Sequence, residues 1–420
     1  MSRDHWTRLP FSKAVEINPK RAVKKGEKVP FVEMAALSTS GSKIQYLEQR
    51  VIASGGSRFQ NGDTLFARIT PCAENGKIGF VDCLPPGRAG AGSTEFIVFG
   101  PRNGVTEPKF VYHLARSKIV REPALGSMMG TTGRQRVPNS VFDEIEVPLP
   151  PLSEQRRIAE ILSSVDEAIH ATQAVIEQTR KVKQGALNRL LTKGMGHTRF
   201  KQTEIGEIPD GWSLTPLAAI SAGKPKSGKS PSTSGSPTDI VSFSIAAVRD
   251  GEVTFKGNLK YVDISPSDAQ PYMVRRGDIL VVRGNANPDI VGSCGVVEEH
   301  PANCIYPDLL IRISPEAQVC HPDFLALVWN SDFCRNQIKS KAKSTNGTYK
   351  INQQDISSIL LPLPPLEEQK LIIQQINALQ VSSRLSKRQL AHLIQTKTAL
   401  MSDLLTGRKR VLADLPMAAE

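Results

Sequence analysis

The segment GKPKSGKS, residues 223–230, has the clearest chemical pattern in this chain of 420 residues, because it fits the phosphate-binding loop G-x-x-x-x-G-K-[ST]. That loop works only between a buried strand and a helix whose N-terminal amide groups face the phosphates. Here Pro231 follows directly, the next residues are STSGSPTD, and no helix is expected after the loop. The flanks therefore favour a flexible basic loop, and a P-loop nucleotide-dependent enzyme is kept as an alternative.

Other patterns for catalysis or metal binding are weaker. The residues EPK at 107–109 fit the E-x-K of restriction nucleases, but they lie at an expected helix start and are interpreted as a cap. The [DNS]PP[YFW] loop of adenine methyltransferases does not occur. Six cysteines are scattered without a CxxC pair, and Cys294, His300, Cys304 and His321 lack the spacing of a zinc finger. We therefore expect no catalytic residue, no metal site and no cofactor in this chain.

The composition favours a folded protein with a polyanionic partner. Hydrophobic residues make up 40% of the chain and charged residues 22%, as is typical of globular domains. The formal charge of +12 would strengthen binding to phosphates through counterion release, although a basic surface that serves only solubility explains it as well. No stretch approaches the roughly 18–20 apolar residues of a membrane span, so we expect a cytoplasmic protein without membrane contact.

The chain contains an internal duplication. The string PLPPLSEQRRI at 148–158 returns as PLPPLEEQKLI at 362–372, an offset of 214 positions. Further matches at this or a nearby offset are TTGRQRV (131–137) with TNGTYKI (345–351), EPKFVYHL (107–114) with HPDFLALV (321–328), NGDTLFARI (61–69) with RGDILVVRG (276–284), and Trp6 and Pro10 with Trp212 and Pro216. Each half therefore comprises a loop-rich α+β unit of about 150 residues followed by a helical segment of about 45 residues.

The two helical segments carry apolar residues in steps of four and three, which is the seam of a coiled coil. Ser153 is the expected N-cap of the first helix, and Glu154 lies near its positive end. The first seam comprises Ile158, Leu162, Val165, Ile169, Ile176 and Leu190, with Thr172, Thr179, Lys183 and Ala186 at intervening positions. The second comprises Ile372, Ile376, Leu379, Leu390, Leu393, Leu400 and Leu404, with Ser383, Ser386 and Lys397 at intervening positions.

The polar positions weaken each seam on its own, so we expect the two helices to pair with each other as an antiparallel coiled coil. A plain amphipathic cap on each domain is the alternative. The expected fold is α+β, with two homologous domains separated by two long helices in a pseudo-twofold repeat. The expected parts are a first domain (1–151), a central helical region (152–195), a second domain (196–365), a distal helical region (366–410) and a tail (411–420).

Two similar basic domains on a rigid spacer suit a linear target with two separated sites, as DNA is. At this point the chain resembles the specificity subunit of type I restriction–modification systems. The resemblance rests on the two proline-led strings, on the loops GTTGRQRV and STNGTYKIN, on the strands GDTLFARI and GDILVVRG, and on IGEIPDGWSLTPL at 205–217. These strings occur in order over nearly the whole chain.

The resemblance implies a subunit without activity of its own, whose two target recognition domains each read one half of a bipartite, asymmetric site in double-stranded DNA. It implies helices that dock two modification (methyltransferase) subunits, which carry S-adenosylmethionine, and restriction subunits that use ATP and Mg²⁺ for translocation and cleavage. A scaffold that binds protein targets through two homologous domains is a further alternative.

Loops matched between the two halves are the best candidates for DNA contact, because Arg, Lys, Asn, Gln, Thr and Tyr side chains can reach base edges or phosphates. In the first domain the predicted DNA-binding residues are Arg68, Lys77, Thr131, Thr132, Arg134, Gln135 and Arg136. In the second domain they are Arg283, Asn285, Asn287, Thr345, Asn346, Thr348, Tyr349 and Lys350.

Overall fold

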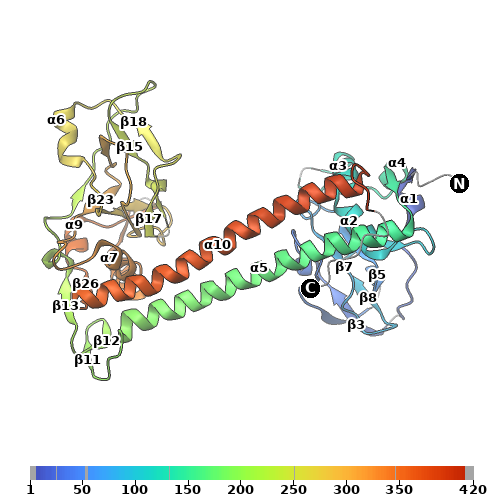
Figure 1. Cartoon of the computed structure of the whole chain (residues 1–420), viewed down its shortest axis with the longest axis horizontal. Helices are drawn as coiled ribbons and strands as arrows, with labels where there is room; N and C mark the ends of the chain where they lie inside the picture. Colours follow the sequence, from blue (N-terminus) through green and yellow to red (C-terminus); the bar gives the residue numbers. More distant parts are fainter. Residues whose placement is uncertain are drawn as a thin grey trace. The chain divides into compact units, whose positions relative to one another are not determined.

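The computed structural model describes residues 6–24, 26–52, 55–131, 133–249, 251–345 and 347–411. The chain forms two compact units, of which unit 1 comprises Met1–Glu177 with Arg384–Glu420 and unit 2 comprises Gln178–Ser383. Both long helices, α5 (Leu152–Lys193) and α10 (Leu366–Leu405), therefore contribute one part to each unit (Figure 1). The domain boundaries expected from the sequence stay a prediction, because the division into units cuts through these helices.

Unit 1 contains two four-stranded sheets, with strand orders β4-β3-β8-β5 and β2-β9-β6-β7, and the pair β1-β10. Its strands are β1 (Thr7–Pro10), β2 (Val15–Ile17), β3 (Lys28–Val32), β4 (Glu48–Val51), β5 (Ser57–Gln60), β6 (Thr64–Ala67), β7 (Ile78–Phe80), β8 (Ala89–Gly92), β9 (Phe96–Pro101) and β10 (Glu146–Leu149). Its short helices are α1 (Phe11–Ala14), α2 (Pro108–Arg116), α3 (Lys118–Gly126) and α4 (Val141–Glu144).

Unit 2 contains a six-stranded sheet of order β14-β23-β19-β21-β17-β16, two three-stranded sheets, β18-β15-β22 and β20-β25-β24, and the pairs β11-β12 and β13-β26. Its strands are β11 (Phe200–Thr203), β12 (Gly206–Pro209), β13 (Ser213–Pro216), β14 (Lys226–Ser227), β15 (Val241–Phe243), β16 (Val248–Arg249), β17 (Gly251–Val253), β18 (Leu259–Tyr261), β19 (Ile279–Val282), β20 (Gly284–Asn285), β21 (Cys294–Val296), β22 (Cys304–Ile305), β23 (Leu310–Ile313), β24 (Lys343–Thr345), β25 (Thr348–Lys350) and β26 (Leu360–Leu363). Its short helices are α6 (Pro266–Ala269), α7 (Pro322–Trp329), α8 (Asp332–Lys341) and α9 (Gln353–Ser357).

The two units repeat one framework, which confirms the duplication seen in the sequence. Thr7 to Pro10 pair with Leu149 to Glu146 in unit 1, and Ser213 to Pro216 pair with Leu363 to Leu360 in the same register in unit 2. The central pair β6-β9 corresponds to β19-β23, and all of β6 and β19 is buried because their apolar runs are covered on both faces. The cap interpretation of EPK is also confirmed, since the Glu107 carboxylate accepts a hydrogen bond from the Phe110 amide at 2.7 Å.

A buried glutamine fastens each domain to the start of a long helix. The Gln155 side chain donates to the carbonyls of Val105 and Pro150 at 2.9 and 2.8 Å and accepts from the Glu107 amide at 2.9 Å. Gln369 makes the equivalent three bonds in unit 2, at 2.9–3.0 Å. Both glutamines are fully buried, so each bond satisfies a backbone group that water cannot reach.

The adjacent glutamate gathers more distant segments at the same place. Glu154 accepts from Trp6 Nε1 at 3.0 Å, from Nε and Nη2 of Arg410 at 2.8 Å each, and from the Val411 amide at 3.1 Å. In unit 2, Glu368 accepts from Trp212 Nε1 at 3.0 Å, from His197 Nε2 at 2.9 Å and from the Met195 amide at 2.9 Å. We call each of these two sets of contacts a carboxylate clasp.

The helix starts differ from the prediction in one detail. Helix α5 begins at Leu152, so Ser153 lies inside the first turn and is exposed, and its assignment as N-cap is wrong. The amide of Gln155 bonds the Pro151 carbonyl at 2.9 Å, and the helix starts two residues earlier than it would after a cap at Ser153. Pro150 and Pro151 can occupy the positions before the first turn because no helical amide bond is required there.

Burial along the helices follows the spacing of the expected seams. Within unit 1, Ile158, Leu162 and Ile169 of α5 and Leu404 of α10 are buried. The helix residues between such positions are exposed or half-buried, apart from a few such as Ala159 and Asp166. Residue numbers rise along α5 from Glu154 to Asp166 as those of their partners fall from Arg410 to Lys397, so the helices are antiparallel in this unit. This burial leaves the helix pair as part of the domain core rather than a free zipper.

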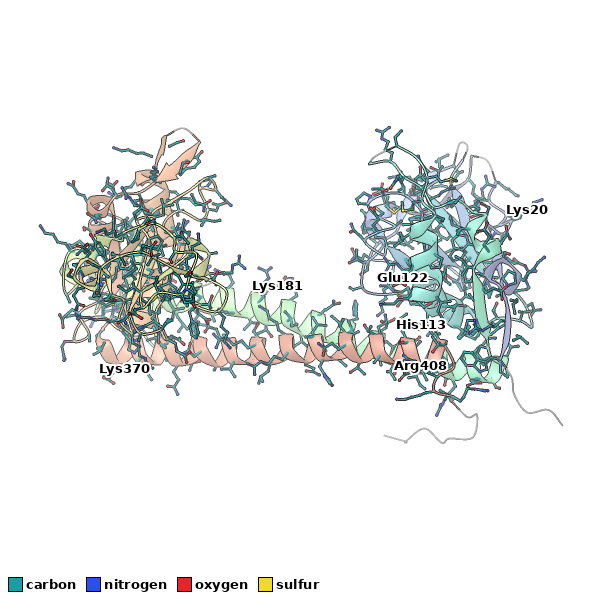
Figure 2. The ribbon with its side chains drawn as sticks, turned by 90° about the horizontal axis from the view of Figure 1, so that it is seen from above. Lys20, His113, Glu122, Lys181, Lys370 and Arg408 are labelled. Carbon is teal, nitrogen blue, oxygen red and sulfur yellow. The ribbon has the colours of Figure 1, made fainter. Side chains whose placement is uncertain are left out.

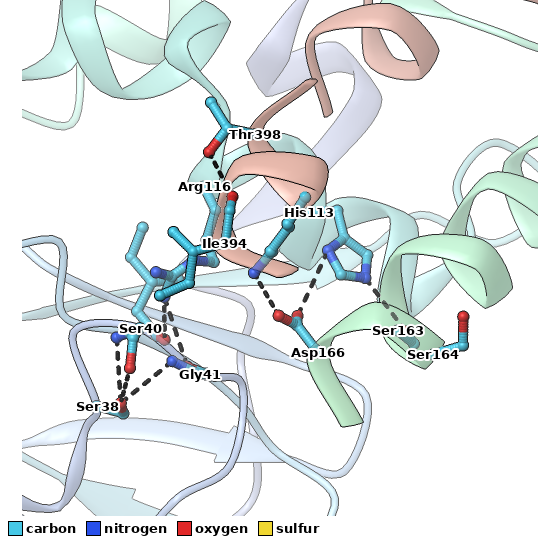
Figure 3. Close-up of polar contacts among 12 residues, drawn as sticks. Ser38, Ser40, Gly41, His113, Arg116, Ser163, Ser164, Asp166, Ile394 and Thr398 are labelled. Atoms are coloured by element: carbon cyan, nitrogen blue, oxygen red, sulfur yellow. Dashed lines mark hydrogen bonds and ion pairs between the residues drawn. The ribbon is translucent and has the colours of Figure 1, made fainter. Parts of the chain in front are cut away.

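The polar residues at the seam have local partners. Lys397 forms an ion pair with Asp166, and each of the two residues is only 7% exposed. His113 of α2 lies beside them, with Nε2 3.1 Å from the Ser163 hydroxyl and Nδ1 4.0 Å from Asp166 Oδ2 (Figure 3). The buried Thr172 hydroxyl donates to the Ala168 carbonyl one turn earlier, at 2.8 Å. A seam lysine and threonine therefore fit the core because each has a partner in it.

No helix among the described residues is both long and apolar enough to cross a membrane.

We predict that acid destabilises unit 1 through His113. Burial, and then the nearby cations Lys397 and Arg116, hold the His113 pKa well below its usual value, so the folded state keeps this ring neutral. The unfolded chain binds a proton below a pH of about 6.5, so stability is full above that pH and falls by roughly 1 kcal/mol at pH 5.5. His113→Gln should remove this part of the pH dependence in urea unfolding followed between pH values of about 5.5 and 7.5.

His392→Gln is the matched control, because His392 is exposed on α10 and its replacement should leave the pH dependence unchanged. Equal pH dependence in the wild type and in His113→Gln would contradict the prediction.

We predict that Glu154→Ala destabilises the protein by about 2 kcal/mol, because it leaves two N–H groups without their acceptor and removes the ion pair with Arg410, whose side chain is 36% exposed. Glu160→Ala on the same helix removes a glutamate whose side chain is 57% exposed and should cost less than about 1 kcal/mol. Chemical unfolding followed by circular dichroism measures both. Similar losses for the two variants would show that the carboxylate clasp adds little to stability.

Candidate nucleic-acid interface

In unit 1 the predicted DNA-binding loop is a hairpin attached to the end of strand β6. Met129 and Arg136 pair across the hairpin, with amide bonds of 3.0 and 2.8 Å, and Arg136 also forms a bridge with Ile69. The Val137 amide bonds the Arg68 carbonyl at 2.8 Å, and the Thr70 amide bonds the Gln135 carbonyl at 3.0 Å. Arg68 and the hairpin are far apart in the sequence and were predicted separately. The structure places them side by side.

Unit 2 repeats this arrangement. Strands β24 and β25 form the hairpin, in which Lys343 pairs with Lys350, and β25 pairs with β20 so that Lys350 lies opposite Gly284. The Ile351 amide bonds the Arg283 carbonyl at 2.9 Å, as the Val137 amide bonds that of Arg68. Arg283 and the second hairpin thus occupy the same place in their domain as Arg68 and the first hairpin do in theirs.

The side chain of Arg136 is held by Glu95, a residue that the sequence did not single out. Nε of Arg136 lies 3.0 and 2.9 Å from the two carboxylate oxygens, and Nη2 lies 2.7 Å from Oε1. These bonds to Arg136 hold the pKa of Glu95 below its usual value. In sequence, a glutamate 41 residues before the arginine gives no signal of this contact.

A basic pocket lies next to Arg68, and it was also missed. It has a volume of about 520 Å³ and is lined by Lys20, Arg21, Arg58 and Arg68, together with polar residues such as Ser57 and Thr94. Arg21 is neutralised by the buried Asp63, at 2.7 Å, whereas Arg58 and Arg68 form no ion pair with any described residue. Within unit 1, Lys20 lies away from the two long helices, whereas His113 lies beside them (Figure 2). Arg58 donates to the Val23 carbonyl at 3.2 Å, which leaves its charge without a carboxylate partner. The pocket therefore adds positive charge to the surface around the hairpin.

The other predicted DNA-binding residues of the first domain differ in exposure and in their hydrogen-bond partners. Lys77 donates its ammonium to the Met34 carbonyl at 2.9 Å, so it has a structural partner within the domain. Thr131 and Arg134 at the hairpin tip are exposed, and Gln135 is half-buried. Thr132 lies outside the described residues.

In the second domain several candidates organise their own loop. The Asn285 side chain accepts from the Asn287 amide at 2.9 Å, and the Asn287 side chain accepts from the Asp289 amide at 2.9 Å. Arg283 donates to the Asp308 carbonyl at 3.4 Å. Thr348 and Tyr349 are half-buried and Lys350 is exposed on β25, whereas Thr345 belongs to β24 and Asn346 lies outside the described residues.

The segment GKPKSGKS does not form a phosphate-binding loop. Lys226 and Ser227 form strand β14 against β23, the Gly228 amide bonds the Leu310 carbonyl at 3.1 Å, and the Ser230 hydroxyl donates to Asp308 at 2.5 Å. A Cβ at Gly228 would lie 2.1 Å from the Tyr306 carbonyl oxygen, so close strand packing accounts for this glycine. Apart from the two residues of β14 the segment is irregular, and its flexibility stays a prediction.

The cysteines are buried or separate rather than gathered. Burial raises the pKa of Cys294 and Cys304 to about 12, so both stay thiols at neutral pH. In the part of the chain that the structure describes, no three His, Cys, Asp or Glu side chains come together as a metal site.

Comparison with known proteins agrees with this repeated architecture. The family model described as type I restriction modification DNA specificity domain matches residues 13–178 and 245–395, one match in each half. The MjaVIII specificity subunit of a type I restriction enzyme from Methanocaldococcus jannaschii is 27% identical over 335 residues, which cover 77% of this chain and 76% of that protein. The EcoKI specificity subunit from Escherichia coli K12 is 28% identical over 301 residues, covering 67% of this chain and 61% of that protein.

Solved structures support the fold. A type I restriction–modification S subunit from M. genitalium is 15% identical, with a TM-score of 0.58 and coverage of 96% of this chain and 97% of that one. A chain from a structural study of assembly and conformational transition in the type I R-M system is 21% identical, with the same TM-score and coverage of 96% and 98%. Because the family model spans both halves and more than half of the residues, the chain belongs to the type I restriction–modification DNA specificity family.

Proposed function

We propose that this chain is the DNA-recognition subunit of a type I restriction–modification complex and that its two domains bind the two halves of a bipartite, asymmetric site. The carrying observation is the hairpin that both domains attach to the same strand end, next to Arg68 in one and Arg283 in the other. The net charge of +12 and the basic pocket beside Arg68 suit a phosphate-rich partner.

The backbones of the two hairpins agree while their side chains differ, and this difference supports the asymmetry. Arg136 on Glu95 in the first domain corresponds to Lys350 beside Leu309 in the second, by the repeat offset. Side chains with different donors select different bases, so two such domains in one chain would read unlike half-sites.

In this proposal the chain carries no catalytic residue and binds no cofactor. Methylation would be carried out by two modification subunits that hold S-adenosylmethionine, and cleavage by restriction subunits that use ATP and Mg²⁺. The long helices would dock these partners, and the complex would act on double-stranded DNA in the cytoplasm. A scaffold for protein targets would not need the phosphate-facing charge, and the salt experiment below separates the two functions.

We predict that expressing this chain with a modification subunit with which it assembles produces adenine methylation at a gapped, asymmetric sequence. The physical reason is that two unlike domains in one chain read two unlike half-sites at a fixed separation. Methylome sequencing of the expressing cells is the measurement. A short palindromic motif, or no new methylation despite an assembled complex, would contradict the proposed function.

We predict a steep salt dependence of DNA binding, with a loss of roughly 10³–10⁵ in affinity between about 50 and 200 mM salt for six to ten phosphate contacts. Arg58→Gln should lower the slope of log affinity against log salt by about 1, because it removes one phosphate contact from the basic pocket. Fluorescence anisotropy with the full chain measures both.

Lys118→Gln is the control for net charge, because it removes one positive charge from a side chain that is 82% exposed on α3. It should leave the salt slope unchanged. A slope that changes equally in the two variants would show that the basic pocket makes no phosphate contact.

A further inference from the structure

The Arg136 side chain has the geometry of a base reader whose orientation is fixed before DNA arrives. Its backbone is held on both sides, by Met129 across the hairpin and by Ile69 at the strand end. Its guanidinium is held by the Glu95 carboxylate through three contacts of 2.7–3.0 Å. Glu95 is itself anchored, because its carbonyl accepts from the Arg68 amide at 2.9 Å and its amide donates to the Ser93 hydroxyl at 3.2 Å.

The contacts with Glu95 use one edge of the guanidinium and leave another edge available. A guanidinium carries five N–H donors in one plane, and the Nε and Nη2 groups on the bound edge face the carboxylate. The remaining hydrogen on Nη2 and one on Nη1 point away from the side chain in parallel. The Arg136 side chain is 42% exposed while that of Glu95 is 23% exposed, so the free edge can meet a partner.

Two parallel donors match the two acceptors of one base. In the major groove, guanine presents N7 and O6 side by side. A bidentate contact from arginine to this pair is the commonest specific base contact in protein–DNA complexes. Adenine offers one acceptor and one donor at the same edge, so it would oppose one of the two N–H groups. A buttressing carboxylate also removes the entropy cost of fixing the arginine rotamer on binding.

We propose that Arg136 reads a guanine in the half-site of the first domain and that Glu95 is the positioning residue that aims it. This inference rests on the proposed function, since it names the base that one domain selects.

The second domain lacks this arrangement at the equivalent place. Lys350 stands where Arg136 does and Leu309 stands where Glu95 does, so neither a planar pair of donors nor a carboxylate is present there. The cross-strand partner in the first domain is Met129, whose side chain is 64% exposed although it is apolar, and in the second domain it is Lys343.

The test uses the full chain assembled with its modification subunits. The DNA is an unmethylated duplex that carries the sequence motif found by methylome sequencing. Each guanine of the motif, on either strand, is replaced in turn by 7-deazaguanine, which lacks the N7 acceptor. At one position we expect a loss of affinity of about fivefold to tenfold for the wild type. Arg136→Lys should bind the natural duplex about tenfold to a hundredfold more weakly and should be less sensitive than the wild type to 7-deazaguanine at that position.

Glu95→Gln tests the positioning role, because it keeps the size of the side chain and removes the charge that holds Arg136. Discrimination between the natural duplex and the one with an altered base at that position should fall, while the salt slope should not decrease, since Arg136 keeps its charge. A purely structural role would instead weaken binding to all duplexes equally and would overturn the positioning assignment.

Arg88→Lys is the matched control, because Arg88 also pairs with a glutamate, Glu27, on the exposed surface of the same unit. It should leave sensitivity to every 7-deazaguanine unchanged. The unfolding transition of each variant is measured first, and Arg136→Lys keeps both charge and an aliphatic stem, so a folded protein is expected.

The outcomes separate this inference from the proposed function. If the wild type shows no sequence preference at all, the proposed function fails. If it reads a bipartite motif but Arg136→Lys stays as sensitive as the wild type to every substituted guanine, or no guanine responds in the wild type, only the guanine assignment is overturned.

Discussion

The structure depends on a carboxylate and a buried amide at the start of each long helix, and the carboxylate is buried in unit 1 and half-buried in unit 2. Glu154 with Gln155, and Glu368 with Gln369, accept or satisfy backbone and side-chain groups from segments that are far apart in sequence. Leaving such buried groups without partners would cost on the order of 1–3 kcal/mol each, so only one placement of a domain over its helix start satisfies them all. The domain that carries each hairpin is thereby fixed to its helix segment.

Both units have a carboxylate clasp, but the basic side chain that binds the carboxylate differs between them. Arg410 meets Glu154 in unit 1, and His197 meets Glu368 in unit 2. The buried ion pair of Asp166 and Lys397 with its neighbour His113 has no counterpart, because the repeat places Gln380 and Leu327 at the positions of Asp166 and His113. Buried ion pairs are costly to desolvate, and removing one partner leaves an uncompensated buried charge, so Asp166 and Lys397 depend on each other.

The periodic parts of the fold could be predicted from the sequence. The repeat offset brought together the hairpin and Arg68, and the four-three spacing identified the buried face of both helices around Ile158 and Leu404. These features are visible because they recur at fixed intervals in the chain. The start of α5 was misplaced by reading Ser153 as a cap, where proline residues before Leu152 already end the preceding strand.

Pairings between unlike segments could not be predicted in this way. The partner of Arg136 is a glutamate on the strand-entry loop before β9, and the partner of the seam residue Lys397 is Asp166 on the other helix. Viewed alone, a lysine in a coiled-coil seam indicates weakness, and only its neighbour in space shows that the charge is compensated. The basic pocket beside Arg68 was missed for the same reason, since Lys20 comes from a loop and Arg58 from strand β5.

The main-chain bonds that hold the hairpins do not involve the side chains at their exposed positions. The backbone pairing of Met129 with Arg136 in one unit is equivalent to that of Lys343 with Lys350 in the other. Replacing one residue at such a position changes the hydrogen-bond donors on the surface and leaves the backbone pairing intact. Lineages of such chains can therefore drift in preference by single substitutions, with folding stability largely spared along the way.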